Sequence, residues 1–409
     1  MTTCNRVSGR AYGGKEGSVA DVPSAAPPAG FLDAASGQPL NPAAREAWAV
    51  AADAGWADPA RLYREGRRAA LLRDSAHEAV AARIGARPDE VSLVAGGALP
   101  AVIGRWLSAP GAPQRLICSA VEHSSVLVEA DALVARGGRA DVIGVDRTGR
   151  VDLPTYLKAV GAGVGGFADP PAIGATLAVL QTANHEVGTR QPVAEVAQAC
   201  REAGVPLLLD ASVTLGRQDP PEGWSLLVGR ASTWGGPPGV SVVAVRRRLH
   251  APPLDLPDAG LPAVISAARG LEWADDHRAD DAARARQLTD RIREVASSTV
   301  PDVSLLGGDD RVEYLTALSC LFVDGEALVL GLDRAGYAIS SGSSCVSDLR
   351  RPSHVLVAMG ALTQGNLRVS LPFGVTDETI DGFLSTFPRV VQDVRAMLHA
   401  DDLSGEPNG

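Results

Sequence analysis

Residues 205–212 read VPLLLDAS, an apolar run that ends in Asp210 and a serine. Two other segments follow the same pattern, RLICSAVEH at 115–123 and ATLAVLQTANHE at 175–186. Short apolar runs with polar ends are typical of buried parallel strands, which deliver side chains to a site at their carboxyl ends. Helical patterns lie between them, such as VAEVAQACREAG at 193–204 with its glycine stop. The alternation predicts an α/β sheet with helices on both faces.

The rest of the chain divides into four predicted regions around this alternation. Residues 1–30 are rich in Gly, Ser, Ala and Pro and have no periodicity, which predicts a disordered leader. Residues 31–275 form the large α/β domain, and their first residues are candidates to pack on a smaller domain. Segments such as LSCLFV, NLRVSL and a long last helix predict that smaller α+β domain over 276–398. Residues 399–409 are expected to be a tail.

The composition limits the classes of partner. The chain has 409 residues, 45% of them hydrophobic, and a formal net charge of -10, which argues against nucleic acid or an anionic membrane surface as the main partner. No apolar stretch reaches the roughly 18 residues that a membrane span needs. Five widely spaced cysteines without a CxxC pair predict a reduced, cytoplasmic protein. Lysine is confined to Lys15 and Lys158.

Several side chains with chemical potential stand at the ends of predicted strands. VAGGALPAVI at 94–103 is a glycine turn that opens a helix, either a phosphate site or a plain tight turn. His123 follows a strand and would project over a site floor, although a lone histidine is often structural. Asp210 ends a buried run, where a carboxylate needs a partner. Arg368, in NLRVSL, alternates with inward apolar residues and therefore points either to solvent or at a fixed anion.

The cysteines differ in their surroundings. Cys345 lies in SSGSSCVS, a small polar segment with nothing nearby that is apolar enough to bury it. Cys118, Cys200 and Cys320 lie in apolar strand or helix patterns and should be shielded, and Cys4 lies in the leader. We therefore predict that Cys345 is the reactive thiol.

Taken in order, these segments resemble the cysteine desulfurases of the class V aminotransferase family. The matching pieces, which span nearly the whole chain, are FLDAASGQPL, VEHSSVL, NHEVGTRQPV, LLLDAS, GGPPG, SSGSSC and PSHVLVAMG. The resemblance implies an aminotransferase fold of type I, with a large domain built on a mostly parallel seven-stranded sheet flanked by helices. It also implies a small α+β C-terminal domain, a two-fold dimer, pyridoxal phosphate bound as an imine on a lysine, and a loop cysteine that carries sulfur as a persulfide.

Some of the family's site residues carry over to this chain. The resemblance places Asp210 at the ring nitrogen, His123 on the ring face, Arg368 at the substrate carboxylate and Cys345 at the persulfide. We therefore predict Cys345, His123 and Arg368 as catalytic candidates, and Asp210, His123 and, less directly, His185 as cofactor contacts, with no metal site. The family's lysine, however, falls on Thr233, so the imine-forming amine is absent.

Other positions also depart from the family. The phosphate-gripping threonine falls on Ala98, its helper serine on Arg230, the glutamine above the ring oxygen on Val213, and the second asparagine of the Asn-Asn-Glu motif on His185. The segment that reaches into the partner subunit's site has no match. Arg230 is a candidate to restore charge at the phosphate and His185 a candidate ring contact, but neither supplies a primary amine. Lys15 is in the leader and Lys158 in a helical stretch, so neither replaces the lysine easily.

Three functions therefore stay open. We expect no covalently bound cofactor, with the family's pyridoxal phosphate as the alternative. In the first of these functions, the chain is a pseudoenzyme subunit that regulates or scaffolds transfer to a sulfur-acceptor protein. It then forms a homodimer, or a heterodimer with an active desulfurase. Alternatively, it relays a persulfide through Cys345. The third alternative is a repurposed catalyst, or a residual pyridoxal-phosphate-dependent desulfurase, that uses His123, His185, Asp210 and Arg368.

Overall fold

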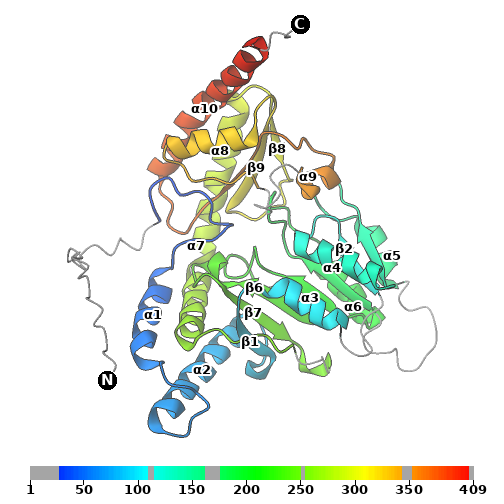
Figure 1. Cartoon of the computed structure of the whole chain (residues 1–409), viewed down its shortest axis with the longest axis vertical. Helices are drawn as coiled ribbons and strands as arrows, with labels where there is room; N and C mark the ends of the chain where they lie inside the picture. Colours follow the sequence, from blue (N-terminus) through cyan, green and yellow to red (C-terminus); the bar gives the residue numbers. More distant parts are fainter. Residues whose placement is uncertain (1–26, 109–114, 162–175, 250–253, 343–351, 405–409) are drawn as a thin grey trace, which may run out of the picture.

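The computed structural model of the chain describes residues 27–108, 115–161, 176–249, 254–342 and 352–404. The described strands form two sheets, one of seven strands in the order β1-β7-β6-β5-β4-β2-β3 and one of three in the order β10-β9-β8 (Figure 1). The strands are β1 (Val91–Ala95), β2 (Arg115–Ser119), β3 (Arg139–Ile143), β4 (Thr176–Gln181), β5 (Leu207–Asp210), β6 (Leu226–Arg230), β7 (Val240–Val245), β8 (Val303–Leu306), β9 (Leu315–Cys320) and β10 (Asn366–Ser370).

The predicted mostly parallel sheet is confirmed. Strands β2 to β6 pair in parallel, while β7 pairs antiparallel with both β6 and β1. The strands read as continuous apolar runs because both faces of the sheet are covered. In β5, for example, Leu207 and Leu209 belong to the core on one face and Leu208 to the core on the other. The polar end of the run, Asp210, is thereby brought to the carboxyl edge of the sheet.

Helices cover both faces of the large sheet. Side chains of α2, α5, α6 and the first half of α7 pack on one face, and those of α3 and α4 on the other. The helix α6 ends, as its sequence predicts, at a left-handed Gly204. The described helices are α1 (Pro42–Ala54), α2 (Arg64–Arg83), α3 (Ala98–Ser108), α4 (Ser124–Ala135), α5 (Leu153–Gly161), α6 (Val193–Ala203), α7 (Leu261–Thr299), α8 (Gly325–Arg334), α9 (His354–Met359) and α10 (Asp377–Ser404), with the short 3-10 turns η1 (Pro88–Glu90), η3 (Ala231–Trp234) and η4 (Arg247–Leu249).

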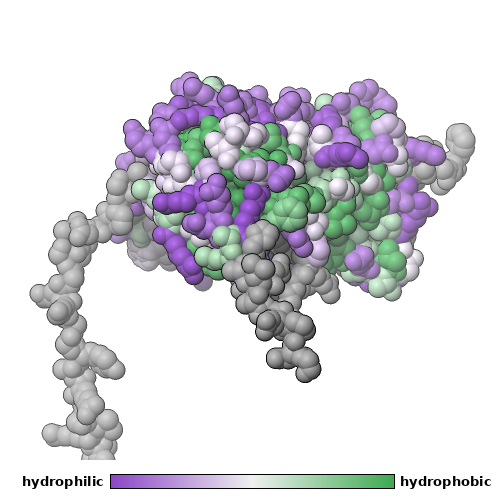
Figure 2. Space-filling view, turned by 90° about the horizontal axis from the view of Figure 1, so that it is seen from above, coloured by the Kyte–Doolittle hydropathy of each residue, from purple (hydrophilic) through white to green (hydrophobic). Residues whose placement is uncertain are grey.

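The small sheet forms a second layer with α8, α10 and the last part of α7 (Figure 1). The domain boundary predicted at residue 275 lies inside α7, a single helix whose apolar side chains enter both cores. At the other end, α10 continues to Ser404, inside the segment 399–409 expected as a tail. Residues 1–26 of the expected leader lie outside the described residues. Figure 2 looks down on the end where α10 lies and shows hydrophobic side chains grouped between hydrophilic ones.

The first described segment, residues 27–41, crosses from the small domain to the large one. Leu32 is buried in the core of the small domain, and Asp33 lies beside Ser370 of β10 in a strand-like bridge. Asn41 then caps α1 by accepting a hydrogen bond from the N–H of Ala44. This segment therefore runs along the junction between the two domains. None of the helices in the described part of the chain is long and apolar enough to cross a membrane.

Arg217 is the central contact at this junction. Its side chain is 1% exposed, and its Nη1 lies 2.7 Å from Oδ2 of Asp281 on α7. The guanidinium also donates to the carbonyl oxygens of Thr233 and Leu371 and to Oε1 of Gln38. It stacks over the ring of Phe373, with 3.7 Å from Cζ to the ring centroid. One buried cation therefore joins the large sheet, α7, the crossing segment and the small domain.

We predict that Arg217→Met lowers the free energy of unfolding by about 3 kcal/mol, because it leaves the half-buried Asp281 carboxylate and the Leu371 carbonyl without their donor. Denaturant unfolding measures the change. Asp281→Asn in the Arg217→Met background should recover part of the loss. Arg73→Met, which removes an exposed arginine of α2, should change stability by less than about 0.5 kcal/mol. Equal effects of Arg217→Met and Arg73→Met would contradict the prediction.

Candidate functional site

The candidate site lies where the carboxyl ends of the central strands meet the small domain. The turn after β2 carries His123, the turn after β4 carries His185, and β5 ends in Asp210. β6 ends in Arg230, and β10 of the small domain supplies Arg368. The ring centroids of His123 and His185 are 5.3 Å apart. Parallel strands place their ends at one edge, so residues distant in the sequence converge here.

His123 and Asp210 lie at the carboxyl ends of the strands β2 and β5. His123 caps α4: its Nδ1 accepts a hydrogen bond from the N–H of Ser125 and lies 2.8 Å from Ser125 Oγ. Burial lowers the pKa of His123, the Asp210 carboxylate opposes that shift, and Arg230 adds to it. Asp210 Oδ1 accepts a hydrogen bond from the N–H of Ser212 at 2.9 Å, which is the kind of partner that its buried position requires. Their cofactor roles remain predictions.

His185 forms a buried pair with Glu186. The distance from His185 Nε2 to Glu186 Oε1 is 3.6 Å, and this nitrogen has no hydrogen-bond partner among the described residues. Burial, followed by the charges of His123 and Arg368, holds the pKa of His185 well below its usual value. Burial raises the pKa of Glu186 to about 7, although Ser353 Oγ donates a hydrogen bond to its Oε2 at 2.6 Å. His185 is thus neutral near neutral pH, whereas Glu186 is about half ionised at pH 7. Glu186 and Ser353 are not among the site residues predicted from the sequence, although the segments NHE at 184–186 and PSH at 352–354 contain them.

Arg368 points at a fixed anion, one of the two directions that its sequence context allowed. That anion is Asp33 of the crossing segment, whose Oδ1 lies 2.8 Å from Arg368 Nη2. The same nitrogen donates to Ser36 Oγ at 2.7 Å, and Nη1 donates to the His185 carbonyl at 2.9 Å. Arg368 is 5% exposed, so its charge is neutralised inside the protein. Binding of a substrate carboxylate by Arg368 remains a prediction.

Thr233 occupies the position that the family resemblance assigns to the lysine. It lies in η3, is 5% exposed, and donates from Oγ1 to the Ser212 carbonyl at 2.6 Å. Its own carbonyl accepts hydrogen bonds from Gln38 and Arg217. Lys158, the one lysine among the described residues, is exposed on α5. A primary amine is therefore missing where an imine would form, and the residues present do not fit covalently bound pyridoxal phosphate.

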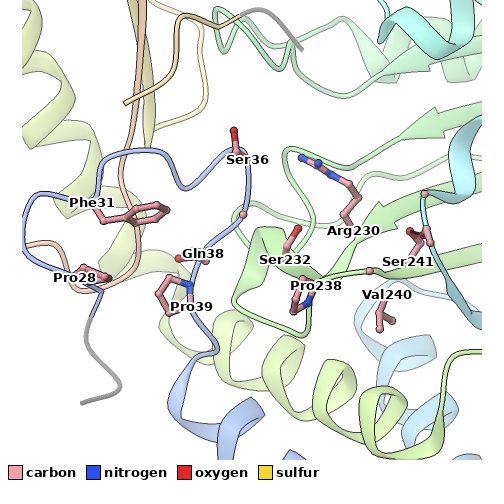
Figure 3. A pocket seen from close by; sticks show the side chains of 14 residues that line it. Pro28, Phe31, Ser36, Gln38, Pro39, Arg230, Ser232, Pro238, Val240 and Ser241 are labelled. Carbon is pink, nitrogen blue, oxygen red and sulfur yellow. Dashed lines mark hydrogen bonds between the residues drawn. The ribbon is translucent and has the colours of Figure 1, made fainter. Parts of the chain in front are cut away.

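A cavity of about 570 Å³ lies beside η3, where Ser232 lines it. It opens between the crossing segment, the turn from η3 to β7, and the glycine turn before α3 (Figure 3). The glycine turn before α3 is the one that the sequence predicts. β1 ends at Ala95, Gly96 has a positive φ of 88°, and α3 begins at Ala98. Arg230 lines the cavity with the hydroxyl side chains of Ser36 and Ser232.

The described cysteines are inert. Cys118, Cys200 and Cys320 are all buried, which confirms the predicted shielding, and burial raises the pKa of Cys200 to about 12 and that of Cys320 to about 11. Burial also raises the pKa of Cys118. Cys345 and Cys4 lie outside the described residues. Among the residues that the structure describes, no three His, Cys, Asp or Glu side chains group in a way that could hold a metal ion.

Comparison with known proteins links this geometry to a family. Residues 57–255 match the family Aminotransferase class-V. The chain is 33% identical over 394 residues to the IscS-like cysteine desulfurase of Mycobacterium tuberculosis. The matched region covers 89% of this chain and 97% of that protein. It is 30% identical over 392 residues to a cysteine desulfurase of Cereibacter sphaeroides, with 90% of this chain and 97% of that protein covered.

Solved structures support the same fold. A NifS-like protein superposes with a TM-score of 0.76 at 20% identity, over 89% of this chain and 99% of the other. The apo structure of cysteine desulfurase from Thermococcus onnurineus NA1 superposes with a TM-score of 0.75 at 16% identity, over 89% of this chain and 94% of the other.

We predict that Glu186→Gln stabilises the protein above pH 7 by up to about 3 kcal/mol. The pKa of Glu186 is about 7 in the folded chain, against 4.5 for the ordinary carboxyl. The folded chain therefore binds a proton more readily than the unfolded one, and stability falls as pH rises from about 4.5 to about 7. The glutamine keeps an acceptor for Ser353 and has no charge to bury.

Thermal unfolding of both proteins between pH 4.5 and 8 tests this expectation. The difference between wild type and Glu186→Gln should grow with pH and vanish toward pH 4.5. The exposed carboxyl of Glu294 on α7 gives a matched control, because Glu294→Gln should leave the pH profile unchanged. A Glu186→Gln profile parallel to wild type would show that burial of this carboxyl has no energetic effect.

Proposed function

Because the chain belongs to the cysteine desulfurase / class V aminotransferase family, we propose that it is a non-catalytic desulfurase-like subunit that regulates or scaffolds sulfur transfer. The chain is a cysteine desulfurase-like protein of sulfur metabolism, and the family uses pyridoxal phosphate as its cofactor. One observation carries the proposal, namely the buried Thr233 in place of the lysine. A threonine hydroxyl cannot form the imine through which such a cofactor is held and exchanged.

Two further features support the same proposal. Arg368, which the resemblance assigns to the substrate carboxylate, already pairs with Asp33 and Ser36. Val213 is buried and Ala98 opens α3, so neither offers a polar side chain where the family resemblance expects one. Each lost hydrogen bond to a charged group weakens binding by about 1.5–3 kcal/mol. The family's chemistry would therefore lose both its attachment point and part of its binding energy.

Two alternatives remain within the same family. A persulfide relay requires Cys345 to accept sulfur from another protein, and the burial of three of the other cysteines favours it over them as the acceptor. A repurposed catalyst would use His123, His185, Asp210 and Arg368, and the lowered pKa values of the two histidines are typical of functional sites as well as of structural ones. A residual pyridoxal-phosphate-dependent desulfurase belongs to this last alternative.

We predict that purified protein with added pyridoxal phosphate shows no absorbance band near about 420 nm, where such an imine absorbs. Borohydride treatment should leave no adduct on the chain. Thr233→Lys alone should recover little desulfurase activity, because Ala98 and Val213 still lack the family's polar groups. A borohydride-stable adduct on the wild-type chain, mapped by mass spectrometry, would overturn the non-catalytic assignment.

We predict that the chain forms a homodimer, or a heterodimer with an active cysteine desulfurase when the two are co-expressed, because the family resemblance implies a two-fold dimer. Size-exclusion chromatography and co-purification measure the assembly. Mass spectrometry after incubation of the mixture with cysteine separates the alternatives. A persulfide on Cys345 that Cys345→Ser removes favours the relay, and a complex without that persulfide favours the regulatory subunit. A monomer that captures no desulfurase would contradict both.

A further inference from the structure

A second cavity, of about 250 Å³, lies where the crossing segment and the start of α1 pass close to α7 and to the turn before α10 (Figure 1). Four prolines line it, together with Trp273 from α7 and Phe373 from the turn. None of the described residues that line it has a charged side chain. We call it the aromatic cavity. Its lining suits an uncharged and mainly apolar body.

Trp273 and Phe373 form two perpendicular walls of the aromatic cavity. Their ring centroids are 5.3 Å apart and their planes meet at 85°. His277, one turn further along α7, stacks on Trp273 with 4.2 Å between the ring centroids. On the other wall, the guanidinium carbon of Arg217 lies 3.7 Å from the centroid of the Phe373 ring. Neighbouring side chains therefore fix both rings, which reduces the side-chain entropy that a ligand covering them would cost.

The amide side chains that line the aromatic cavity already have partners, whereas the indole of Trp273 does not. Gln38 donates to the Thr233 carbonyl and accepts a hydrogen bond from the N–H of Phe373. The amide nitrogen of Asn41 donates to two backbone carbonyls. The indole N–H of Trp273 makes no hydrogen bond with the described residues. One donor beside apolar walls is therefore left for a ligand that offers an acceptor.

An acidic side chain follows Trp273 on the same face of α7. Asp280 is exposed and comes seven residues, or two helical turns, after Trp273, which places it about 10 Å further along the helix axis. It has no basic partner among the described residues. The nearby arginines Arg217, Arg269 and Arg284 each pair with a carboxylate. The surroundings of the aromatic cavity therefore favour a basic group over an acidic one.

We propose that the aromatic cavity docks an extended, proline-containing segment of a partner protein that carries a lysine or arginine beside its prolines. Extended proline-rich segments dock in aromatic-lined grooves, where their low conformational entropy limits the cost of binding. A polyproline II segment has no internal hydrogen bonds, so its carbonyl groups are free to accept from the Trp273 indole. The basic side chain of the partner would lie near Asp280.

The chain's own N-terminal segment fits this site less well than a basic partner does. Pro27 lines the aromatic cavity, which shows that the cavity accepts a proline. The charged residue that most closely precedes Pro27 is Asp21, however, and Asp280 would repel it. We therefore assign the cavity to another protein. This inference goes beyond the proposed regulatory function and does not depend on it.

Isothermal titration of the full chain with a synthetic peptide tests the proposal. The probe peptide repeats Ala-Pro-Pro twice and ends in two arginines. An analogue with alanine at every proline should bind about tenfold more weakly or less, because it lacks the rings and the preformed extended backbone. An analogue with two glutamates in place of the arginines should bind about two- to fivefold more weakly at low salt.

The comparison of the three peptides can overturn each part of the proposal. Absence of probe binding at millimolar concentration would overturn the site. Equal affinity of the alanine analogue would show nonspecific attraction to an acidic protein and would overturn the recognition of proline. Equal affinity of the glutamate analogue would overturn the assignment to a basic partner.

Three variants locate the peptide. Trp273→Ala should weaken probe binding about tenfold or more, and Trp273→Phe should weaken it less, because it keeps a ring and loses the indole donor. Asp280→Asn should weaken it about two- to fivefold at low salt and should leave binding of the glutamate analogue no weaker. The matched controls are Trp56→Ala and Asp131→Asn, which remove an exposed tryptophan and an exposed aspartate and should leave the affinity unchanged.

Each outcome decides the assignment. Equal losses in Trp273→Ala and Trp56→Ala would place the peptide elsewhere. If Trp273→Ala fails to fold, judged by its thermal transition, Trp273→Phe and Asp280→Asn decide, because they preserve the ring and an exposed polar side chain. A synthetic peptide of residues 15–28 that binds as tightly as the probe would assign the cavity to the chain's own N-terminal segment and overturn the partner assignment. The imine and dimer experiments do not involve this cavity, so the two proposals fail separately.

Discussion

The buried guanidinium of Arg217 is the contact on which the site's geometry depends. It binds the Thr233 carbonyl, while the Thr233 hydroxyl binds Ser212, so η3 is held from two sides. Through Asp281 and Leu371 the same cation fixes α7 and the small domain. The frame that surrounds the site is therefore held by hydrogen bonds of the chain itself.

Charge is distributed unevenly between the site and the whole chain. The chain has a formal net charge of -10, yet Arg230 and Arg368 both lie in the site. Burial keeps His185 neutral and raises the pKa of Glu186 to about 7, so Glu186 is about half ionised at pH 7. Arg368 is compensated internally by Asp33, and Asp210 adds a carboxylate to the same site as Arg230.

The sequence predicted the large sheet well because local patterns determine it. LLLD forms β5, the glycine stop ends α6, and the apolar surroundings of Cys118 do bury it. Contacts between distant segments were not predictable in this way. The Asp33–Arg368 pair depends on the path of the crossing segment over the small domain, which no local periodicity encodes. For the same reason the raised pKa of Glu186 followed only from the packing around it.

The continuity of α7 has a mechanical consequence. Its 39 residues make one rod about 58 Å long that is embedded in both cores. Closing one domain onto the other would require this rod to bend, and helices bend sharply mainly at prolines, bulges or inserted side chains. The one proline of α7 lies in its first turn. The two cores are therefore joined by one continuous helix, so a hinge between them would have to bend α7 away from its proline.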